Sequence, residues 1–315
     1  MSRSADLGVD FAGLRLRNPL VAASGTCGWG EELDRIEGFS SRLLGAIILK
    51  STTREPRLGN ATPRVVEAAG GAGLINSIGL ENPGVDVVVR DYLPRLAEAD
   101  TVVIANAAGN TPDDYAATAG RLCSSPVVRA IEVNISCPNV KKGGLLFGID
   151  PEGAAAVVAA VRAVTDKPVI AKLTPNVTDI APIARACVEA GADALSVSNT
   201  FRALAIDVKS RQPVLGANFG GLSGPAIKPL ALLKVHETWQ AVRGAGVPLL
   251  GGGGIMTGAD LLEFILAGAS ACFVGTLLLR EAAACGRLLD DLAALLEGQG
   301  VPRIADLTGA LTLHT

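Results

Sequence analysis

Short apolar runs alternate with longer helix-like segments along the whole chain, and this alternation limits the fold more than any other feature. The eight runs are 20–24, 46–50, 102–106, 131–135, 169–173, 194–198, 248–252 and 271–275. Continuous apolar runs of this length are typical of strands buried on both faces, as in parallel sheets. Parallel strands need long crossover connections, which are usually helices. The chain is therefore predicted to be an α/β protein.

The segments between the runs have the pattern of helices. The clearest are 111–124, 151–168, 179–193 and 258–270. Segment 151–168 opens with a proline and an acidic residue, as helices commonly do. Eight strands with alternating helices predict a (β/α)8 TIM barrel, with an open doubly wound sheet as the alternative. Because such barrels reach this length as one unit, residues 1–315 are expected to form a single domain.

Polar residues or glycines recur at the carboxyl ends of all eight runs. They are Ser24-Gly25, Lys50-Ser51, Asn106, Asn134, Lys172, Ser198-Asn199, Gly253-Gly254 and Gly275-Thr276. One such residue is explained by turn chemistry, but eight on eight strands favour a barrel, whose carboxyl ends converge on one mouth where active sites lie. Two long connections, 51–101 and 199–247, are expected to carry extra structure that caps this mouth.

The composition excludes several classes of protein. Hydrophobic residues make up 49% of the chain and charged residues 19%, which is too apolar for a disordered protein. A net charge of −3 and 3% aromatic residues give no indication of nucleic-acid binding. We see no charge-free apolar window of membrane-spanning length and no signal peptide. A soluble, cytoplasmic protein is expected.

The cysteine and histidine positions predict no metal site. None of the six cysteines forms a CxxC pair or a spacing suited to zinc or an iron–sulfur cluster. Most are expected to be small buried hydrophobes. With only two histidines in the chain, a histidine-based triad is not expected either. The chemistry must use other groups.

Glycines after the seventh and eighth runs predict a phosphate site. Four glycines occupy 251–254 and Gly275-Thr276 follows the last run, with Gly220, Gly221 and Gly224 expected to close over the phosphate site. Loops at these two places in a barrel commonly bind phosphate, because glycine lets backbone N–H groups approach it. One phosphate suits a mononucleotide such as FMN, and Lys50 and Lys172 suit the pyrimidine end of a flavin. The alternatives are tight turns and lysines that extend to water.

Cys137 follows the run 131–135 and stands beside Lys141, Lys142 and two glycines. A thiolate can act as a general base when nearby cations bring its pKa toward neutrality. Asn134 and Asn139 flank Cys137. Because amide side chains both donate and accept hydrogen bonds, they can bind a ring with imide-like edges. The alternative is an incidental loop cysteine. Further amides, Asn76, Asn106 and Asn199, indicate a polar, planar ligand, although each also suits a turn.

Together these motifs resemble the dihydroorotate dehydrogenase family over almost the whole chain. The matching stretches include 18-NPLVAASGT-26, 50-KSTTREPRLGNATPR-64, 75-INSIGLENPG-84, 134-NISCPN-139, 172-KLTPN-176, 219-FGGLSGPAIKPLAL-232 and 253-GGI-255. The resemblance implies oxidation of dihydroorotate to orotate in pyrimidine biosynthesis, with one FMN per chain. A cysteine base implies class 1, and the sequences of segments 59–64 and 76–84 look like those of the type 1B catalytic subunit.

A type 1B enzyme implies a partner subunit that carries FAD and a 2Fe–2S cluster and passes electrons to NAD⁺. A homodimer, or a heterotetramer with that subunit, is expected. The alternatives are a related pyrimidine-ring dehydrogenase, or a fumarate- or quinone-dependent class 1 enzyme without the partner. Cys27 and segment 67–74 depart from the type 1B pattern. Trp29 is expected in the core, with a docking surface as the alternative.

The resemblance also implies a role for each matching residue. Cys137 takes the C5 proton while hydride leaves C6 for the flavin. The implied substrate-binding residues are Lys50, Asn76, Ser77, Ile78, Gly79, Leu80, Asn134, Asn139, Asn199 and Thr200. The implied FMN-binding residues are Ser24, Lys50, Ser51, Asn106, Asn134, Lys172, Ser198, Gly224, Gly253, Gly254, Gly275 and Thr276.

Overall fold

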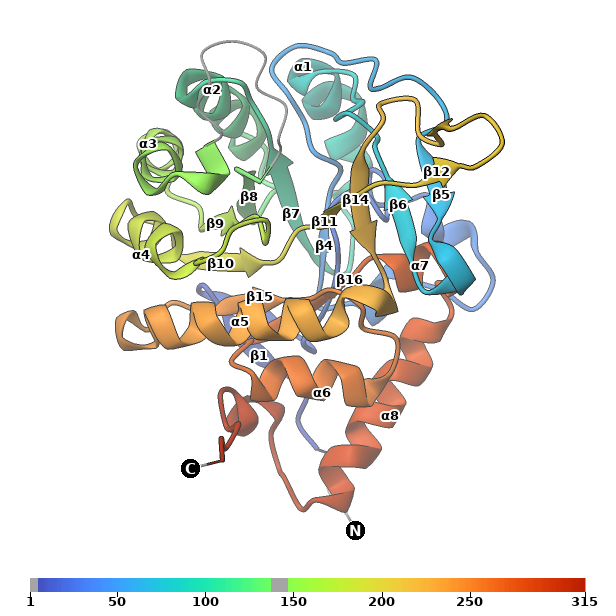
Figure 1. Cartoon of the computed structure of the whole chain (residues 1–315). Coiled ribbons are helices and arrows are strands. Elements are labelled where there is room, and N and C mark those ends of the chain that lie inside the picture. Colours follow the sequence, from blue (N-terminus) through green and yellow to red (C-terminus); the bar gives the residue numbers. More distant parts are fainter. Residues whose placement is uncertain (1–4, 137–146, 315) are drawn as a thin grey trace.

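A computed structural model describes residues 5–136 and 147–314 of the chain. Its centre is a closed barrel of eight parallel strands, in the order β10-β15-β16-β3-β4-β7-β8-β9 (Figure 1). The strands are β3 (Leu20–Ala22), β4 (Ala46–Ile48), β7 (Val102–Ala107), β8 (Ala130–Asn134), β9 (Val169–Lys172), β10 (Ala194–Val197), β15 (Leu249–Gly251) and β16 (Ala271–Val274). All eight coincide with the predicted runs to within a few residues. The predicted TIM barrel is confirmed: β10 pairs with both β15 and β9, the two ends of the strand order are thereby joined, and the closed order excludes an open sheet.

The helices surround the barrel, as the alternating pattern predicts (Figure 1). They are α1 (Val85–Val87), α2 (Pro112–Cys123), α3 (Pro151–Arg162), α4 (Ala181–Glu189), α5 (Lys228–Val242), α6 (Gly258–Leu266), α7 (Thr276–Glu281) and α8 (Ala284–Gly298). Side-chain caps set several starts: Asp150 accepts from Gly153 N, and Thr257 forms a capping box with Asp260. In the described ranges, no helix is both long and apolar enough to cross a membrane.

The two long connections form a cap sheet beside the barrel mouth, as expected. The four antiparallel strands are β5 (Val65–Glu67), β6 (Leu74–Asn76), β11 (Phe201–Ala203) and β14 (Gly220–Ser223), in the order β11-β14-β6-β5. In register, Asn76 pairs with Gly221, so the two connections meet side by side (Figure 1). Segment 67–74 runs from the last residue of β5 to the first residue of β6 and contains the turn between them. Two hairpins, β1 (Val9–Phe11) with β2 (Leu14–Leu16) and β12 (Ile206–Asp207) with β13 (Gln212–Pro213), complete the strands.

Apolar side chains fill the space between the barrel strands, such as β3 and β4, and the helices that surround them. Toward the carboxyl ends of the strands the interior becomes polar. Asn106, Glu132, Lys172, Ser196 and Ser198 are all buried there. Buried polar groups are costly unless they are paired, so this end of the barrel is where a functional site is expected.

Candidate active site

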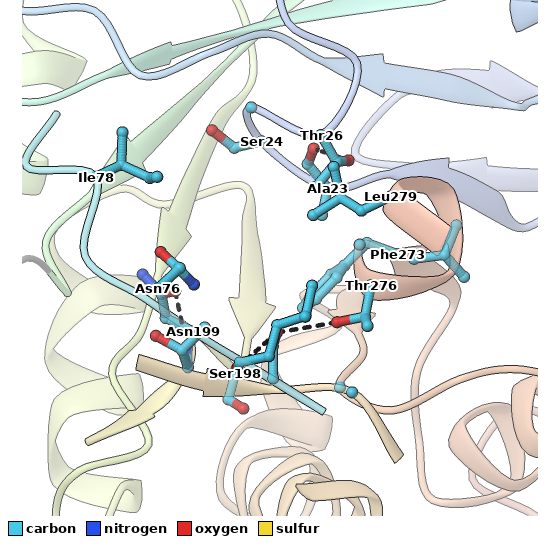
Figure 2. Close-up of a pocket in the computed structure, with 18 of the residues that line it drawn as sticks. Ala23, Ser24, Thr26, Asn76, Ile78, Ser198, Asn199, Phe273, Thr276 and Leu279 are labelled. Carbon is cyan, nitrogen blue, oxygen red and sulfur yellow. Dashed lines mark hydrogen bonds between the residues drawn. The ribbon is translucent and has the colours of Figure 1, made fainter. Parts of the chain in front are cut away.

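A cavity of about 460 Å³ opens at the carboxyl ends of the barrel strands and is bounded on one side by the cap sheet. Fifteen of the predicted residues line it: Ser24, Lys50, Ser51, Asn76, Ile78, Leu80, Lys172, Ser198, Asn199, Thr200, Gly224, Gly253, Gly254, Gly275 and Thr276. In Figure 2, Asn76, Ser198 and Asn199 approach it from the opposite side to Phe273 and Thr276. Residues scattered over the sequence thus meet at one site.

The other predicted residues lie beside or beneath the cavity. Ser77 Oγ accepts a hydrogen bond from Asn60 Nδ2 (2.8 Å), and Gly79 packs against the same Asn60. Asn134 does not line the cavity itself, but its Nδ2 donates to Oγ of the lining residue Ser51 at 3.3 Å. Asn106 lies deeper in the barrel, where it is fully buried. Cys137 and Asn139 lie outside the described residues.

Backbone geometry at three glycines builds one wall of the cavity. Gly224, Gly253 and Gly254 all have positive φ, which side-chain-bearing residues rarely adopt. A Cβ on Gly254 would lie 2.8 Å from Gly224 O and 3.0 Å from the Lys228 backbone N. The loop after β15 therefore packs backbone against backbone on the turn that precedes α5. Thr276 Oγ1 donates to Ser223 Oγ (2.9 Å) on the same side of the cavity (Figure 2).

Two lysines bring positive charge to the cavity in different ways. Lys50 lies two residues past the end of β4 and is half-buried, and its ammonium has no acceptor among the described residues. Lys172 ends β9 and is buried, with its Nζ 3.4 Å from Glu132 Oε2. The Lys172 Nζ also lies 5.3 Å from the ring centroid of Phe273, a lining residue. The cavity thus combines cationic groups with a glycine wall, which suits an anionic, planar ligand.

The amides at the mouth are held by protein partners. Asn76 Nδ2 donates to Gly221 O at 3.3 Å, across the cap sheet. Asn199 Oδ1 accepts from Thr200 N (2.8 Å), and its Nδ2 donates to Ser136 Oγ. Because each amide keeps further hydrogen-bonding capacity, these side chains are oriented in advance for a ligand with both donors and acceptors.

Sequence reasoning missed part of the lining and one buried acid. Gly25, at the carboxyl end of a predicted strand, also lines the cavity. The lining residues that were missed are Ala23, Thr26, Val65, Leu74, Glu81, Ser223, Ile227, Ile255, Phe273, Val274 and Leu279. Most are ordinary apolar residues, for which the sequence offers no signal. Glu132 is different, because a carboxylate inside the apolar run 131–135 is a visible exception to the pattern.

The cysteines in the described ranges are structural, as expected for small buried side chains. Burial raises the pKa of Cys27, Cys187 and Cys285 to about 12, and it also raises the pKa of Cys272. Cys123, on α2, is half-buried. Trp29 packs against the core, and its ring lies tilted against that of Tyr92 with the ring centroids 4.8 Å apart, which agrees with the expected core position of this residue.

Because only the thiolate is nucleophilic, a raised pKa slows alkylation near neutral pH. We expect brief treatment of the native chain with iodoacetamide to leave Cys27, Cys187, Cys272 and Cys285 unmodified. Peptide mass spectrometry reads out each site, and labelling after unfolding is the control for reagent access. Fast modification of Cys27 in the folded chain would contradict its burial.

Comparisons with known proteins agree with this geometry. The family model described as dihydroorotate dehydrogenase matches residues 6–296. A Pelobacter propionicus protein named dihydroorotate dehydrogenase B (NAD(+)), catalytic subunit, is 51% identical over 306 residues, covering 97% of this chain and 98% of that protein. A Desulforudis audaxviator protein of the same name is 53% identical over 302 residues, covering 96% of each.

A solved structure supports the same assignment. The crystal structure of DHODH in complex with ferulenol from Eimeria tenella superposes with a TM-score of 0.80 and 25% sequence identity, covering 98% of this chain and 90% of that one. Sequence similarity over nearly the full length and similarity of the fold therefore point the same way. The chain belongs to the dihydroorotate dehydrogenase family.

Proposed function

We propose that this chain oxidises dihydroorotate to orotate in pyrimidine biosynthesis, with one FMN in the cavity and Cys137 as the base that removes the C5 proton. The observation that carries the proposal is the cavity itself, which unites a glycine wall, two lysines and preoriented amides at the barrel mouth. Family membership supplies the reaction. The whole chain acts as a single catalytic domain in this proposal.

The residues that line the cavity fit FMN. Ser198 Oγ is buried without a hydrogen-bond partner among the described residues, and the Lys50 ammonium likewise lacks an acceptor there. A flavin ring has donors and acceptors that match such groups, and its phosphate suits the glycine wall. The proposed FMN-binding residues are Ser24, Lys50, Ser51, Asn106, Asn134, Lys172, Ser198, Gly224, Gly253, Gly254, Gly275 and Thr276. Bound FMN supplies a two-electron acceptor for the hydride that leaves C6.

The residues of the chain position the substrate and handle its proton. Asn76 and Asn199, already fixed by their protein partners, are proposed to bind the pyrimidine edges together with Asn134, Asn139 and Thr200. Lys50 offers its ammonium to an anionic group of substrate or cofactor. Segment 77–80 closes the site from the cap-sheet side. Cys137 then holds the C5 proton during the reaction. A single positioned general base of this kind raises the reaction rate by a large factor.

A partner subunit is proposed to carry the electrons onward. The relatives with about half of their residues identical are named as catalytic subunits of an NAD⁺-type enzyme, which indicates a second chain. That chain is proposed to hold FAD and a 2Fe–2S cluster and to reduce NAD⁺. The assembly is proposed to be a cytoplasmic heterotetramer built around a homodimer.

Anaerobic mixing of the purified chain with dihydroorotate tests the reaction. Flavin absorbance should bleach rapidly, because reduction of FMN needs only this chain's own residues. If the yellow protein stays oxidised with dihydroorotate but bleaches with another dihydropyrimidine, that dihydropyrimidine is the substrate instead. A chain that takes up no FMN would overturn the proposal.

Gly254→Ala tests the glycine wall. The new Cβ would meet Gly224 O at 2.8 Å, and the backbone at this position has a φ of +91°, so the loop must move. We expect FMN affinity, measured by fluorescence titration of the apoprotein, to fall about 10- to 100-fold, because strained backbone of this kind costs about 1–3 kcal/mol. Gly286→Ala on α8, where a Cβ meets nothing within 4 Å, is the matched control. Unchanged FMN affinity in Gly254→Ala would remove this loop from the site.

A further inference from the structure

Glu132 is a fully buried carboxylate that the proposed reaction does not use. It lies on β8 within the barrel, and its Oε2 accepts a hydrogen bond from Asn106 Nδ2 at 2.5 Å. The same oxygen lies 3.4 Å from Lys172 Nζ. Its other oxygen, Oε1, has no partner among the described residues. A buried charge is costly in free energy. The Glu132 carboxylate, directly beneath the cavity, is therefore a candidate for a functional role.

Strand register explains how Glu132 reaches the cavity through Lys172. Glu132 pairs with Asn106 of β7 and with Ile170 of β9, so these residues form one layer of the barrel. Lys172 is two residues farther along β9, level with Asn134 and one layer nearer the mouth. Side chains two residues apart on a strand share a face. The Lys172 ammonium thus stands between the buried carboxylate below and the lined cavity above.

Lys172 has little freedom in this arrangement. Within the described residues Glu132 is its acceptor, and the Phe273 ring faces the ammonium from another side at 5.3 Å. Three further buried polar atoms lack a partner in the described part of the chain: Asn106 Oδ1 on β7, Ser196 Oγ on β10 and Ser198 Oγ directly after β10. The polar interior therefore centres on one ion pair, whose positive end borders the cavity.

We infer that Glu132 is a positioning residue that holds the Lys172 ammonium toward the cavity and, through its negative charge, lowers the reduction potential of the FMN bound there. The inference rests on the proposed function, because it needs FMN in the cavity. Reduction adds negative charge to the flavin. A neighbouring carboxylate opposes that charge and offsets part of the stabilisation by Lys172, and the effect is strong because the site is buried.

Glu132→Gln tests the inference, because glutamine keeps the shape and an acceptor oxygen but removes the charge. We expect reduced FMN to gain about tenfold in affinity relative to oxidised FMN, which corresponds to a potential about 30 mV more positive. A dye-coupled reductive titration of the full FMN-loaded chain measures this shift. Lys172→Gln should move the potential in the negative direction. Glu237→Gln, which breaks an ion pair with Lys234 on the outer helix α5, is the matched control and should leave the potential unchanged.

If Glu132→Gln does not fold, the double variant Glu132→Gln/Lys172→Gln provides the test instead. It carries the same net charge as the wild-type pair, so its potential should lie above that of Lys172→Gln and near the wild-type value. A structural role alone would lower the melting temperature and leave these potentials equal, and equal potentials would overturn the inference. A wild-type chain without FMN would instead overturn the proposed function, and this inference with it.

Discussion

Replacing Cys137 with serine is expected to slow reduction of bound FMN by dihydroorotate by about 10²- to 10⁴-fold near neutral pH, the usual contribution of a general base. A serine hydroxyl is a far weaker acid than a thiol and offers almost no anionic form near neutral pH. FMN affinity should be unchanged, because the base acts on the substrate. Stopped-flow absorbance under anaerobic conditions measures the rate directly.

Cys123→Ser is the matched control for this substitution. Cys123 is a half-buried cysteine on α2 that does not line the cavity, and burial raises the pKa of its thiol, so it is a poor base. Its replacement should leave the rate of FMN reduction unchanged. If Cys137→Ser reduces FMN as fast as the wild-type chain does, the base must be another group.

Replacing Lys50 with methionine should lower the rate of FMN reduction by about 10²- to 10³-fold, comparable to loss of one preorganised electrostatic donor. Lys50 is half-buried, lines the cavity and has no acceptor for its ammonium among the described residues. Its charge is therefore available to a ligand, and methionine keeps the length of the side chain without that charge. The rate at saturating dihydroorotate, measured beside the affinity for FMN, separates a catalytic effect from loss of the cofactor.

Lys209→Met is the control for a general effect of lost charge, because Lys209 is exposed in the turn of the β12–β13 hairpin and does not line the cavity. It should reduce FMN at the wild-type rate. Lys50→Arg adds a second check: an arginine keeps the charge but needs more room, so partial recovery is expected. Equal rates in Lys50→Met and the wild type would remove this lysine from the reaction.

Local sequence patterns were sufficient to predict the barrel. A run such as 102–106 is apolar on both faces, and only a strand covered on both sides buries it fully. Local signals, such as the proline and acidic residue that open segment 151–168, marked where helices begin, and α3 does begin at Pro151. Because these signals are local, they survive without knowledge of the tertiary structure. Segment 151–168 was predicted too long: α3 ends at Arg162, and the guanidinium of Arg162 binds carbonyl oxygens of the turn that follows.

The candidate site was predictable to the extent that it follows from strand ends. Lys172 ends β9, Ser198 follows β10 and Lys50 lies just past β4, and the fold brings all three to one cavity. Asn106 also ends a predicted run, yet it lies a layer lower than Lys172, because the strands of a barrel are staggered. The stagger depends on closure of all eight strands, which no single run encodes.

The sequence by itself determined the fold class, the place of the mouth and most of the groups around it, because hydrophobic periodicity and glycine or polar strand ends are local properties. Only the tertiary structure decided which groups touch. It paired Asn76 with Gly221 across the cap sheet, packed Gly254 against Gly224, and set Glu132 beneath Lys172. These contacts join residues far apart in the chain, and their geometry follows from strand register and barrel closure rather than from any neighbouring residue.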